Sequence, residues 1–325
     1  MPPLDVIGYS NANVDILLKV EKLPAHDEKI KGKLLGKLPG GTMANYACMV
    51  SKLGLKAGWT GTIGQDQAGQ LLVADFIKYQ VDVSTIRQLE DVATMFAVIM
   101  IDHTGERSII VVPSFYEPAL NKEQQAAIAQ ARLLYTGPYQ ETSFLAVAKW
   151  ARQNDTLVAI DVELTAQLDL DEVKEICINS NIVIFNQAVI KKLYNLTYQE
   201  FSDWLAMAEL LQKLVSEYQL NLAGITLGSN GCILVDRDHY YKFPGFKIEV
   251  IDTTAAGDCF NAALTTALLR GWELEKAGFY ANAAGALATQ GYGARGYLPG
   301  HQAIKDFLKE RDFQDSLVKK QIKSL

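Results

Sequence analysis

Short runs rich in β-branched residues alternate with amphipathic stretches through most of this 325-residue sequence, and this alternation constrains the fold more than any other feature. Residues 157–160, 182–185 and 222–227 are typical of buried strands, whereas residues 144–153 and 201–218 carry helical spacing. Strands that alternate with helices form parallel sheets, because each crossover helix returns the chain to the end of the sheet at which the previous strand began. The sequence therefore predicts an α/β fold with a doubly wound, mostly parallel sheet.

Two segments interrupt this pattern. Residues 13–38 and 94–112 have the alternation of antiparallel strands joined by turns, with every second side chain directed to one buried face. We expect these two insertions to form a small β-sheet lid over one edge of the main sheet. Hydrophobic residues make up 49% of the chain, enough for one large core, and we predict a single domain over residues 1–325.

Composition excludes several classes of function. The net charge of -6 and the pI near 5.4 give no general attraction to nucleic acid or to anionic lipid. The apolar runs fall well short of the ~20 residues that span a bilayer, and the four cysteines are too scattered for a disulfide framework or a zinc site. We expect a soluble, cytoplasmic protein with small-molecule partners, and we interpret Lys319, Lys320 and Lys323 as a solvated helix end.

The most informative segment is a turn rich in small residues at 251–261, which leads into a helix. Small residues allow the backbone to approach a ligand, and the first N–H groups of a helix lack internal partners, so they can bind an anion. Asp258 lies in this first turn, where its carboxylate could act as a general base beside a bound phosphate. It could equally be an ordinary acidic residue that favours the positive end of the helix.

A second glycine-rich turn opens a helix that ends at Gly54. Gly40 and Gly41 would let the backbone crowd a ligand, and Asn45, one turn later, can both donate to and accept from hydroxyl groups. Upstream, Asn13 and Asp15 would face the same cleft and suit paired hydroxyls. Simple turn chemistry is the competing explanation for this upstream pair.

These turns, with two further ones, resemble the motifs of a known family. Segment 252–258 (DTTAAGD) is similar to the second signature of the ribokinase family of carbohydrate kinases, which includes ribokinase, fructokinase and adenosine kinase. Segment 40–54 is similar to its first signature, 61–69 to its Gly-x-Asp-x-x-Gly turn, and 225–231 to its nucleotide-binding turn. The matches keep the family's order over most of the chain.

The resemblance implies a ribokinase-like fold, magnesium-ATP as phosphoryl donor, potassium as an auxiliary cation and a sugar-like acceptor beneath the lid. It implies that Asp258 is the catalytic base. The implied anion hole consists of the amides of Ala255, Ala256 and Gly257. The implied sugar contacts are Asn13, Asp15, Gly40, Gly41 and Asn45. The implied nucleotide contacts are Asn186, Thr226, Gly228, Gly231 and Asn282, the last of which could equally be an ordinary polar residue of its helix. The implied potassium ligands are Asp252 and Thr254.

The sequence departs from the family at two points. The family's Asn-x-x-Glu motif, whose glutamate organises magnesium, begins here at Asn186 but ends at Val189, which cannot contact the ion or its water. Magnesium would then depend on the ATP phosphates, on solvent or on another acid such as Glu163. Thr42 and Met43 replace a lysine and a glycine of ribokinase, which argues against plain ribose as the substrate.

Three alternatives accompany the prediction of a sugar kinase. The first is a weak or inactive sensor of the same fold, suggested by Val189, and the second is a nucleoside kinase. The third, a nicotinamide dehydrogenase, lacks its Gly-x-Gly-x-x-Gly fingerprint after the first strand. Because the lid strand around 96–101 would leave an apolar face uncovered, we also expect a homodimer that forms through the lid.

Overall fold

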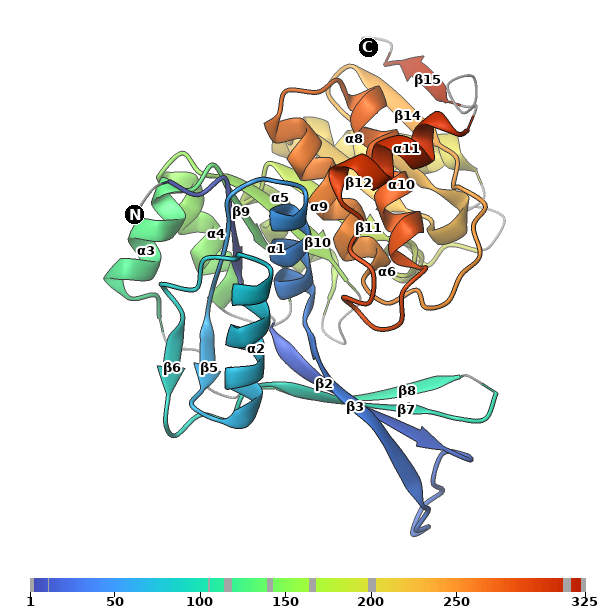
Figure 1. Ribbon diagram of the computed structural model, residues 1–325. Helices are drawn as coiled ribbons and strands as arrows, with labels where there is room; N and C mark the ends of the chain where they lie inside the picture. Colours follow the sequence, from blue (N-terminus) through green and yellow to red (C-terminus); the bar gives the residue numbers. More distant parts are fainter. Residues whose placement is uncertain are drawn as a thin grey trace.

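A large, mostly parallel sheet forms the centre of the molecule (Figure 1). The computed structural model describes residues 3–10, 12–104, 106–113, 119–138, 143–163, 168–197, 203–311 and 317–322. Within this described part, the main sheet has nine strands in the order β15-β14-β13-β12-β11-β10-β9-β1-β4. The strands are β1 (Val6–Tyr9), β4 (Ala57–Thr60), β9 (Leu133–Thr136), β10 (Leu157–Val162), β11 (Ile182–Asn186), β12 (Leu222–Thr226), β13 (Cys232–Val235), β14 (His239–Phe243) and β15 (Val318–Gln321).

Helices cover both faces of this sheet. One layer contains α1 (Thr42–Lys52), α2 (Gln67–Lys78), α9 (Ala256–Leu269), α10 (Leu274–Ala288) and α11 (His301–Lys309). The other contains α3 (Lys122–Gln130), α4 (Ser143–Gln153), α5 (Leu170–Ile178), α6 (Gln187–Leu193) and α8 (Trp204–Tyr218). Because successive side chains of a strand point to opposite faces, Val158 and Ile160 pack in one core and Ala159 in the other. The predicted α/β class is confirmed.

The direction of winding reverses at β1, which pairs in parallel with β4 on one side and with β9 on the other. The chain that follows β1 builds the first helix layer through α1 and α2, whereas the chain that follows β9 builds the second layer through α4. In open α/β sheets, ligands bind at the carboxyl ends of the strands beside such a reversal. The fold thus points to the ends of β1, β9 and β10 as the place for a site.

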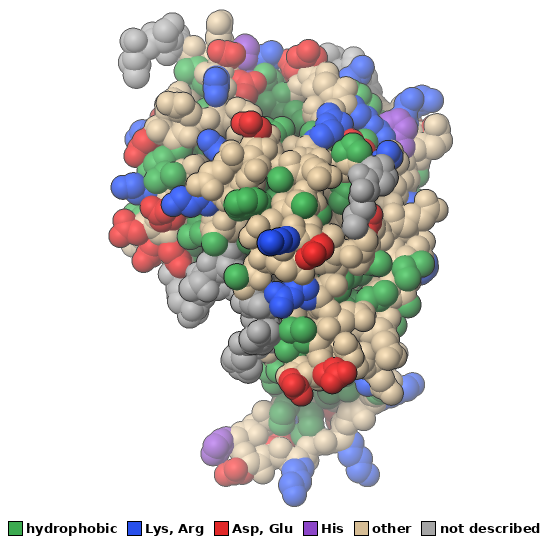
Figure 2. Space-filling model, turned by 90° about the vertical axis from the view of Figure 1, so that its left-hand side faces the viewer, with side chains coloured by type: hydrophobic (Ala, Val, Ile, Leu, Met, Phe, Trp, Pro, Cys, Tyr) green, Lys and Arg blue, Asp and Glu red, His purple; other side chains and the backbone are tan. Residues whose placement is uncertain are grey.

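A separate four-stranded sheet projects from this body within the described residues, in the order β3-β2-β7-β8 (Figures 1 and 2). Its strands are β2 (Asn13–Val20), β3 (Gly32–Gly40), β7 (Phe96–Ile101) and β8 (Arg107–Val112). They coincide with the two expected insertions, 13–38 and 94–112, except that β3 runs two residues further. We call this four-stranded sheet the outer sheet. Figure 2 shows charged side chains at its tip, which are compatible with exposure to water.

The motif at 61–69 attaches the outer sheet to the body. After β5 (Thr62–Gly64), which pairs with β6 (Arg87–Leu89), Asp66 caps α2 by accepting a hydrogen bond from the Gly69 amide at 2.7 Å. The same carboxylate accepts bonds from the amide (2.9 Å) and hydroxyl (2.7 Å) of Thr94, just before β7. The motif therefore supports the outer sheet through one capping carboxylate.

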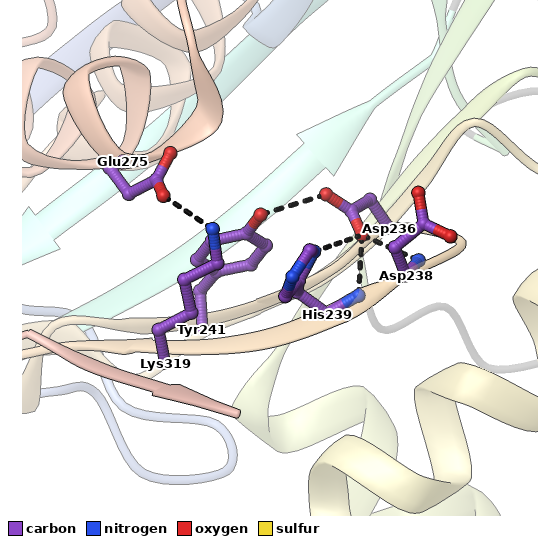
Figure 3. Close-up of polar contacts among 6 residues, drawn as sticks. All are labelled: Asp236, Asp238, His239, Tyr241, Glu275 and Lys319. Carbon is purple, nitrogen blue, oxygen red and sulfur yellow. Dashed lines mark hydrogen bonds and ion pairs between the residues drawn. The ribbon is translucent and has the colours of Figure 1, made fainter. Parts of the chain in front are cut away.

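The C-terminal lysines lie in a strand, so the interpretation of a helix end was wrong for Lys319 and Lys320, while Lys323 is outside the described residues. Strand β15 pairs antiparallel with β14 at the edge of the sheet. Figure 3 shows Lys319 reaching Glu275 of α10, with an Nζ–Oε1 distance of 2.7 Å. Exposed lysines on an edge strand discourage pairing with another chain, which explains their presence in a strand of low apolar content.

None of the helices in the described residues combines the length and the apolar character that crossing a membrane requires.

Candidate active site

Asp258 lies in the first turn of α9, and only 6% of its surface is exposed. Ala255, the residue directly before this helix, has φ 62°, a left-handed conformation that costs a residue with a side chain about 1–2 kcal/mol. This conformation brings the Ala256 N–H to the carbonyl of Thr253 at 3.2 Å. Of the three amides expected to form an anion hole, that of Ala256 is therefore engaged within the turn. Strain of this kind concentrates at functional sites.

Asn45 connects the two glycine-rich turns. It lies in the first turn of α1, and its Nδ2 donates a hydrogen bond of 2.7 Å to Oδ2 of Asp258, although 213 positions separate the two residues. A donated hydrogen bond of this kind stabilises the ionised carboxylate. The first and second signature segments thus meet through a buried hydrogen bond.

Asn13 and Asp15 lie at the beginning of β2, on the same side of the molecule as Asp258. Nδ2 of Asn13 donates to Oδ1 of Asp15 at 2.6 Å. A Cβ atom at Gly40 would lie 2.4 Å from Oδ2 of Asp15, so only glycine allows this carboxylate to pack against the backbone there. Gly40, Gly41 and Asn45 follow one another from the end of β3 into α1. The structure therefore brings the predicted substrate residues together.

Two further acids approach Asp258 from the end of β10. One carboxylate oxygen from each of Asp161, Glu163 and Asp258 lies within 4.8 Å of the others. The Tyr135 hydroxyl donates to Asp161 at 3.3 Å and accepts from Nδ2 of Asn261 at 2.9 Å. Oδ1 of Asn261 is buried without a hydrogen-bond partner among the described residues. We call Asp161, Glu163 and Asp258 the acidic cluster.

Burial and mutual repulsion perturb the acidic cluster. Burial, and next the charge of Glu163, raise the pKa of Asp258 to about 7. The hydrogen bond from Asn45 and the charge of Arg295 act in the opposite direction, and Asp15 adds a smaller rise to this pKa. Burial, Glu163 and Asp258 likewise raise the pKa of Asp161 well above its ordinary value. A carboxyl with a pKa near 7 is suited to proton transfer at neutral pH.

A cavity of about 520 Å³ lies directly beside this turn. Its wall includes Ala256 and Gly257 of the anion turn together with four predicted nucleotide residues: Thr226, Gly228, Gly231 and Asn282. Sequence reasoning missed the apolar part of the wall, which includes Phe246, Ile248, Val250, Phe260 and Ala286. An apolar wall beside a helix N-terminus can hold a flat base and its phosphates.

Glycine is required at one position of the nucleotide turn. Gly231 has φ 91°, and a Cβ atom there would lie 2.1 Å from the carbonyl oxygen of Phe243. Asn282, on α10, donates through Nδ2 to the carbonyl of Pro244 at 3.2 Å. This bond joins α10 to the segment after β14, against which Gly231 packs.

Asn186 and Val189 have structural roles. The Asn186 side chain caps α6 by accepting from the Val189 amide at 3.0 Å, and in the sheet Asn186 pairs with Thr226 of the neighbouring strand. Val189 is completely buried in the second core. The position that holds a glutamate in the family motif is therefore an apolar packing position in this chain.

Asp252 organises a loop beside the site. Its Oδ1 accepts bonds from the amide (3.0 Å) and hydroxyl (2.7 Å) of Thr254, and its Oδ2 accepts from the Gly293 amide at 3.0 Å. The loop that contains Gly293 also carries Arg295, which sequence reasoning missed. Arg295 contacts Asn45 at 3.0 Å, although 250 positions separate them. No local motif in the sequence marks this residue. The signal that identifies it is its burial in the structure, which is unusual for a charged side chain.

Comparisons with known proteins agree with this geometry. Residues 1–300 match the family described as pfkB family carbohydrate kinase. The chain is 25% identical to an ATP-dependent ribose-1-phosphate kinase from Halopiger xanaduensis, over 94% of this chain and 98% of that protein. It is 27% identical to a ribokinase from Lactococcus lactis, over 95% and 98% of the two chains.

The structure superimposes on that of Arabidopsis thaliana ribokinase complexed with ribose and ATP, with a TM-score of 0.82. That match covers 95% of this chain and 99% of the other at 24% identity, which supports the fold. The resemblance to the ribokinase family inferred from the motifs is confirmed. The chain belongs to the pfkB family and is a carbohydrate kinase.

Proposed function

We propose that this kinase transfers the γ-phosphate of ATP to a hydroxyl group of a sugar or sugar-like small molecule, with Asp258 as the general base. Asp258 would accept the hydroxyl proton while the hydroxyl oxygen bonds to the γ-phosphorus. The bond to the bridging oxygen then breaks, and ADP leaves. The observation that carries this proposal is the position of Asp258, at a helix N-terminus between the nucleotide cavity and Asn45.

The other predicted site residues fall into two main groups, one proposed to contact the acceptor and one proposed to contact ATP. The residues proposed to contact the acceptor are Asn13, Asp15, Gly40, Gly41 and Asn45. The residues proposed to contact ATP are Thr226, Gly228, Gly231, Asn282 and Asn186. Asn186 does not line the cavity but pairs with Thr226 on the neighbouring strand. The anion hole is assigned to Ala255 and Gly257, because the Ala256 amide already donates to Thr253. We further propose that the outer sheet, which the sequence predicted at residues 13–38 and 94–112, is a lid of the single 1–325 domain.

The acidic cluster fits magnesium. Carboxylate oxygens are the ligands that Mg²⁺ prefers, and the three carboxylates of the cluster repel one another unless a cation or a proton lies between them. The orphaned Oδ1 of Asn261 offers an acceptor for a metal-bound water. We propose that Asp161 and Glu163 hold the ion, so that Glu163 replaces the carboxylate missing at Val189. Magnesium bound there would neutralise charge on the transferred phosphoryl group.

Potassium fits the loop at Asp252. The Asp252 carboxylate and the carbonyl of Thr254 would hold it, because such a cation prefers hard oxygen atoms and hydrogen bonds keep these two residues together. The ion would supply positive charge next to the anion turn. Turnover with potassium should exceed turnover with sodium, and equal rates would contradict this assignment.

The test of function is ADP release from magnesium-ATP in the presence of pentoses, hexoses, sugar acids, sugar phosphates or nucleosides, with and without potassium. Asp258→Asn should reduce turnover by about 10²- to 10⁴-fold, the usual cost of losing a general base. The matched control is Asp236→Asn, because Asp236 is also a hydrogen-bonded carboxylate but lies on the β13–β14 turn, where it accepts from His239 and Tyr241 (Figure 3). Near-normal turnover by Asp258→Asn would remove the proposed base.

The same assay decides between the alternatives. A signal with nucleosides alone would indicate a nucleoside kinase. Silence across the whole panel, with ATP still bound, would indicate a sensor whose weak chemistry follows from Val189.

We also propose a homodimer through the lid. Ile109, Ile110 and Val111 of β8 are each more than half exposed, so both faces of this strand present apolar surface. The pairing of β2, β7 and β8 places Ile110 on the face opposite Asp15. Sedimentation velocity at micromolar concentration should give a dimer, and Ile110→Glu should give a monomer. A monomeric wild-type protein would contradict this proposal.

A further inference from the structure

A buried arginine contacts Asn45, the residue that donates a hydrogen bond to the proposed base Asp258. The side chain of Arg295, from the loop between α10 and α11, is only 5% exposed. Its Nε donates to Oδ1 of Asn45 at 3.0 Å, its Nη2 donates to the carbonyl of Gly40 at 3.2 Å, and its Nη1 pairs with the carboxylate of Asp75 on α2. The guanidinium therefore joins α2, the end of β3 and the start of α1.

The chemistry of the guanidinium group fixes the orientation of Asn45. A side-chain amide has one acceptor end and one donor end, and rotation by 180° exchanges them. Because a guanidinium group can only donate, the end of the Asn45 amide that meets Arg295 must be the oxygen. The NH₂ end then faces Asp258, to which it donates at 2.7 Å. A reversed amide would direct an oxygen at a carboxylate, which is repulsive.

Asp75 in turn fixes Arg295. It is 12% exposed, so the ion pair is largely removed from water, and the planar guanidinium has little freedom once its three partners are in place. Phe76, the next residue of α2, places its ring 5.7 Å from the guanidinium carbon. A chain of directional contacts therefore runs from Asp75 through Arg295 and Asn45 to Asp258.

We infer that Arg295 is a positioning residue, which orients the Asn45 amide toward Asp258 and holds the Gly40 carbonyl at the entrance of α1. The inference rests on the proposed roles of Asn45 and Asp258 as acceptor contact and base. Arg295 acts through Asn45 and Gly40. Its loss should therefore affect the acceptor and the phosphoryl transfer, and leave the nucleotide cavity unchanged, because Arg295 is not part of the wall of that cavity.

The first test needs no turnover. In protein labelled with ¹⁵N-asparagine, the side-chain amide of Asn45 is identified by its loss in Asn45→Ser. In Arg295→Met, exchange of these amide protons with water should accelerate about tenfold, the equivalent of one hydrogen bond. The control Arg270→Gln removes a similar arginine contact, to the Leu53 carbonyl at the other end of α1, and should leave the Asn45 signal unchanged. An unchanged Asn45 signal in Arg295→Met would overturn the inference.

Arg295→Met leaves Asp75 buried without its partner, and the double variant Arg295→Met/Asp75→Asn removes both charges together, which keeps the experiment valid if the single variant does not fold. With the acceptor found by the ADP assay, either variant should lower kcat and raise the acceptor KM, each about tenfold, and leave the KM for ATP within about twofold. Equal loss of both KM values, as from a general loosening, would contradict the inference. Full turnover in Asp258→Asn would instead contradict the proposed base, and the Asn45 exchange would still test Arg295.

Discussion

The ionisation of Asp258 should make the protein less stable above neutral pH. The folded-state pKa is about 7, against 3.8 for an ordinary aspartate, because burial and Glu163 disfavour the charge. A raised pKa means that the folded protein holds its proton more tightly than the unfolded chain does. The contribution to stability is therefore fully present below pH ~4 and is lost as the pH rises through ~7.

The magnitude follows from the size of the shift. About three pKa units correspond to ~4 kcal/mol, and relaxation of the surrounding charges reduces the expected penalty to ~2–4 kcal/mol at pH 8.5. Asp258→Asn removes this charge and keeps an oxygen to accept the hydrogen bond from Asn45. For 325 residues, an unfolding entropy of about 0.7 kcal/mol per kelvin converts the gain to about 3–6 °C in Tm.

The assay is thermal unfolding in EDTA, which excludes bound metal, at pH 5 and pH 8.5. Asp258→Asn should unfold above the wild type at pH 8.5, and the gain should fall to less than half at pH 5, where the unfolded aspartate is still largely ionised. Asp66→Asn is the control of opposite sign, because hydrogen bonds from Gly69 and Thr94 outweigh the effect of burial and lower the pKa of Asp66. Its stabilising charge is present at every pH above the ordinary aspartate pKa of 3.8, so Asp66→Asn should lower Tm by about the same amount at pH 5 and at pH 8.5. A Tm gain for Asp258→Asn that is equal at both pH values would refute this reasoning.

Three further substitutions test other parts of the site. Glu163→Gln should raise the magnesium concentration needed for half-maximal ADP release by about 10–100-fold, and an unchanged magnesium titration would remove Glu163 from the metal site. Ala286→Phe should fill the nucleotide cavity and raise the KM for ATP with little effect on the acceptor KM; a change confined to the acceptor would contradict the assignment of that cavity. Val189→Glu should not increase the activity. It should lower the free energy of unfolding by about 3 kcal/mol or more in urea titrations, because the carboxylate would enter an apolar core. A gain in activity by this variant would show that position 189 can reach the metal.

Some properties of the molecule are local, and for these the sequence is sufficient. The sequence distinguishes β10 from α8 because β10 is a short, continuous apolar run that is buried on both faces, whereas burial in α8 repeats every three to four residues. The turns at Gly40 and Gly231 are marked by glycine because a side chain would collide with the backbone or with a neighbouring carboxylate. Asp258 and Asn45 could be predicted as site residues because each lies at the start of a helix, directly after a loop rich in glycine or other small residues.

Other properties depend on which surfaces meet. The ends of β10 and α9 must converge before Asp161 and Glu163 can raise the pKa of Asp258, and nothing in the spacing of these residues encodes that approach. Arg295 resembles any arginine of a loop until packing removes it from water beside Asn45. The lysines of β15 belong to a strand because β14 offers an open edge, not because their own sequence favours one. Apart from β15, the sequence alone indicated the main helices, strands, turns and signature residues, because local conformation and burial period depend on near neighbours. Only the tertiary structure decided the charge balance and the orientation of the site, because these depend on contacts between residues far apart in the sequence, such as Glu163 with Asp258 and Asn45 with Arg295.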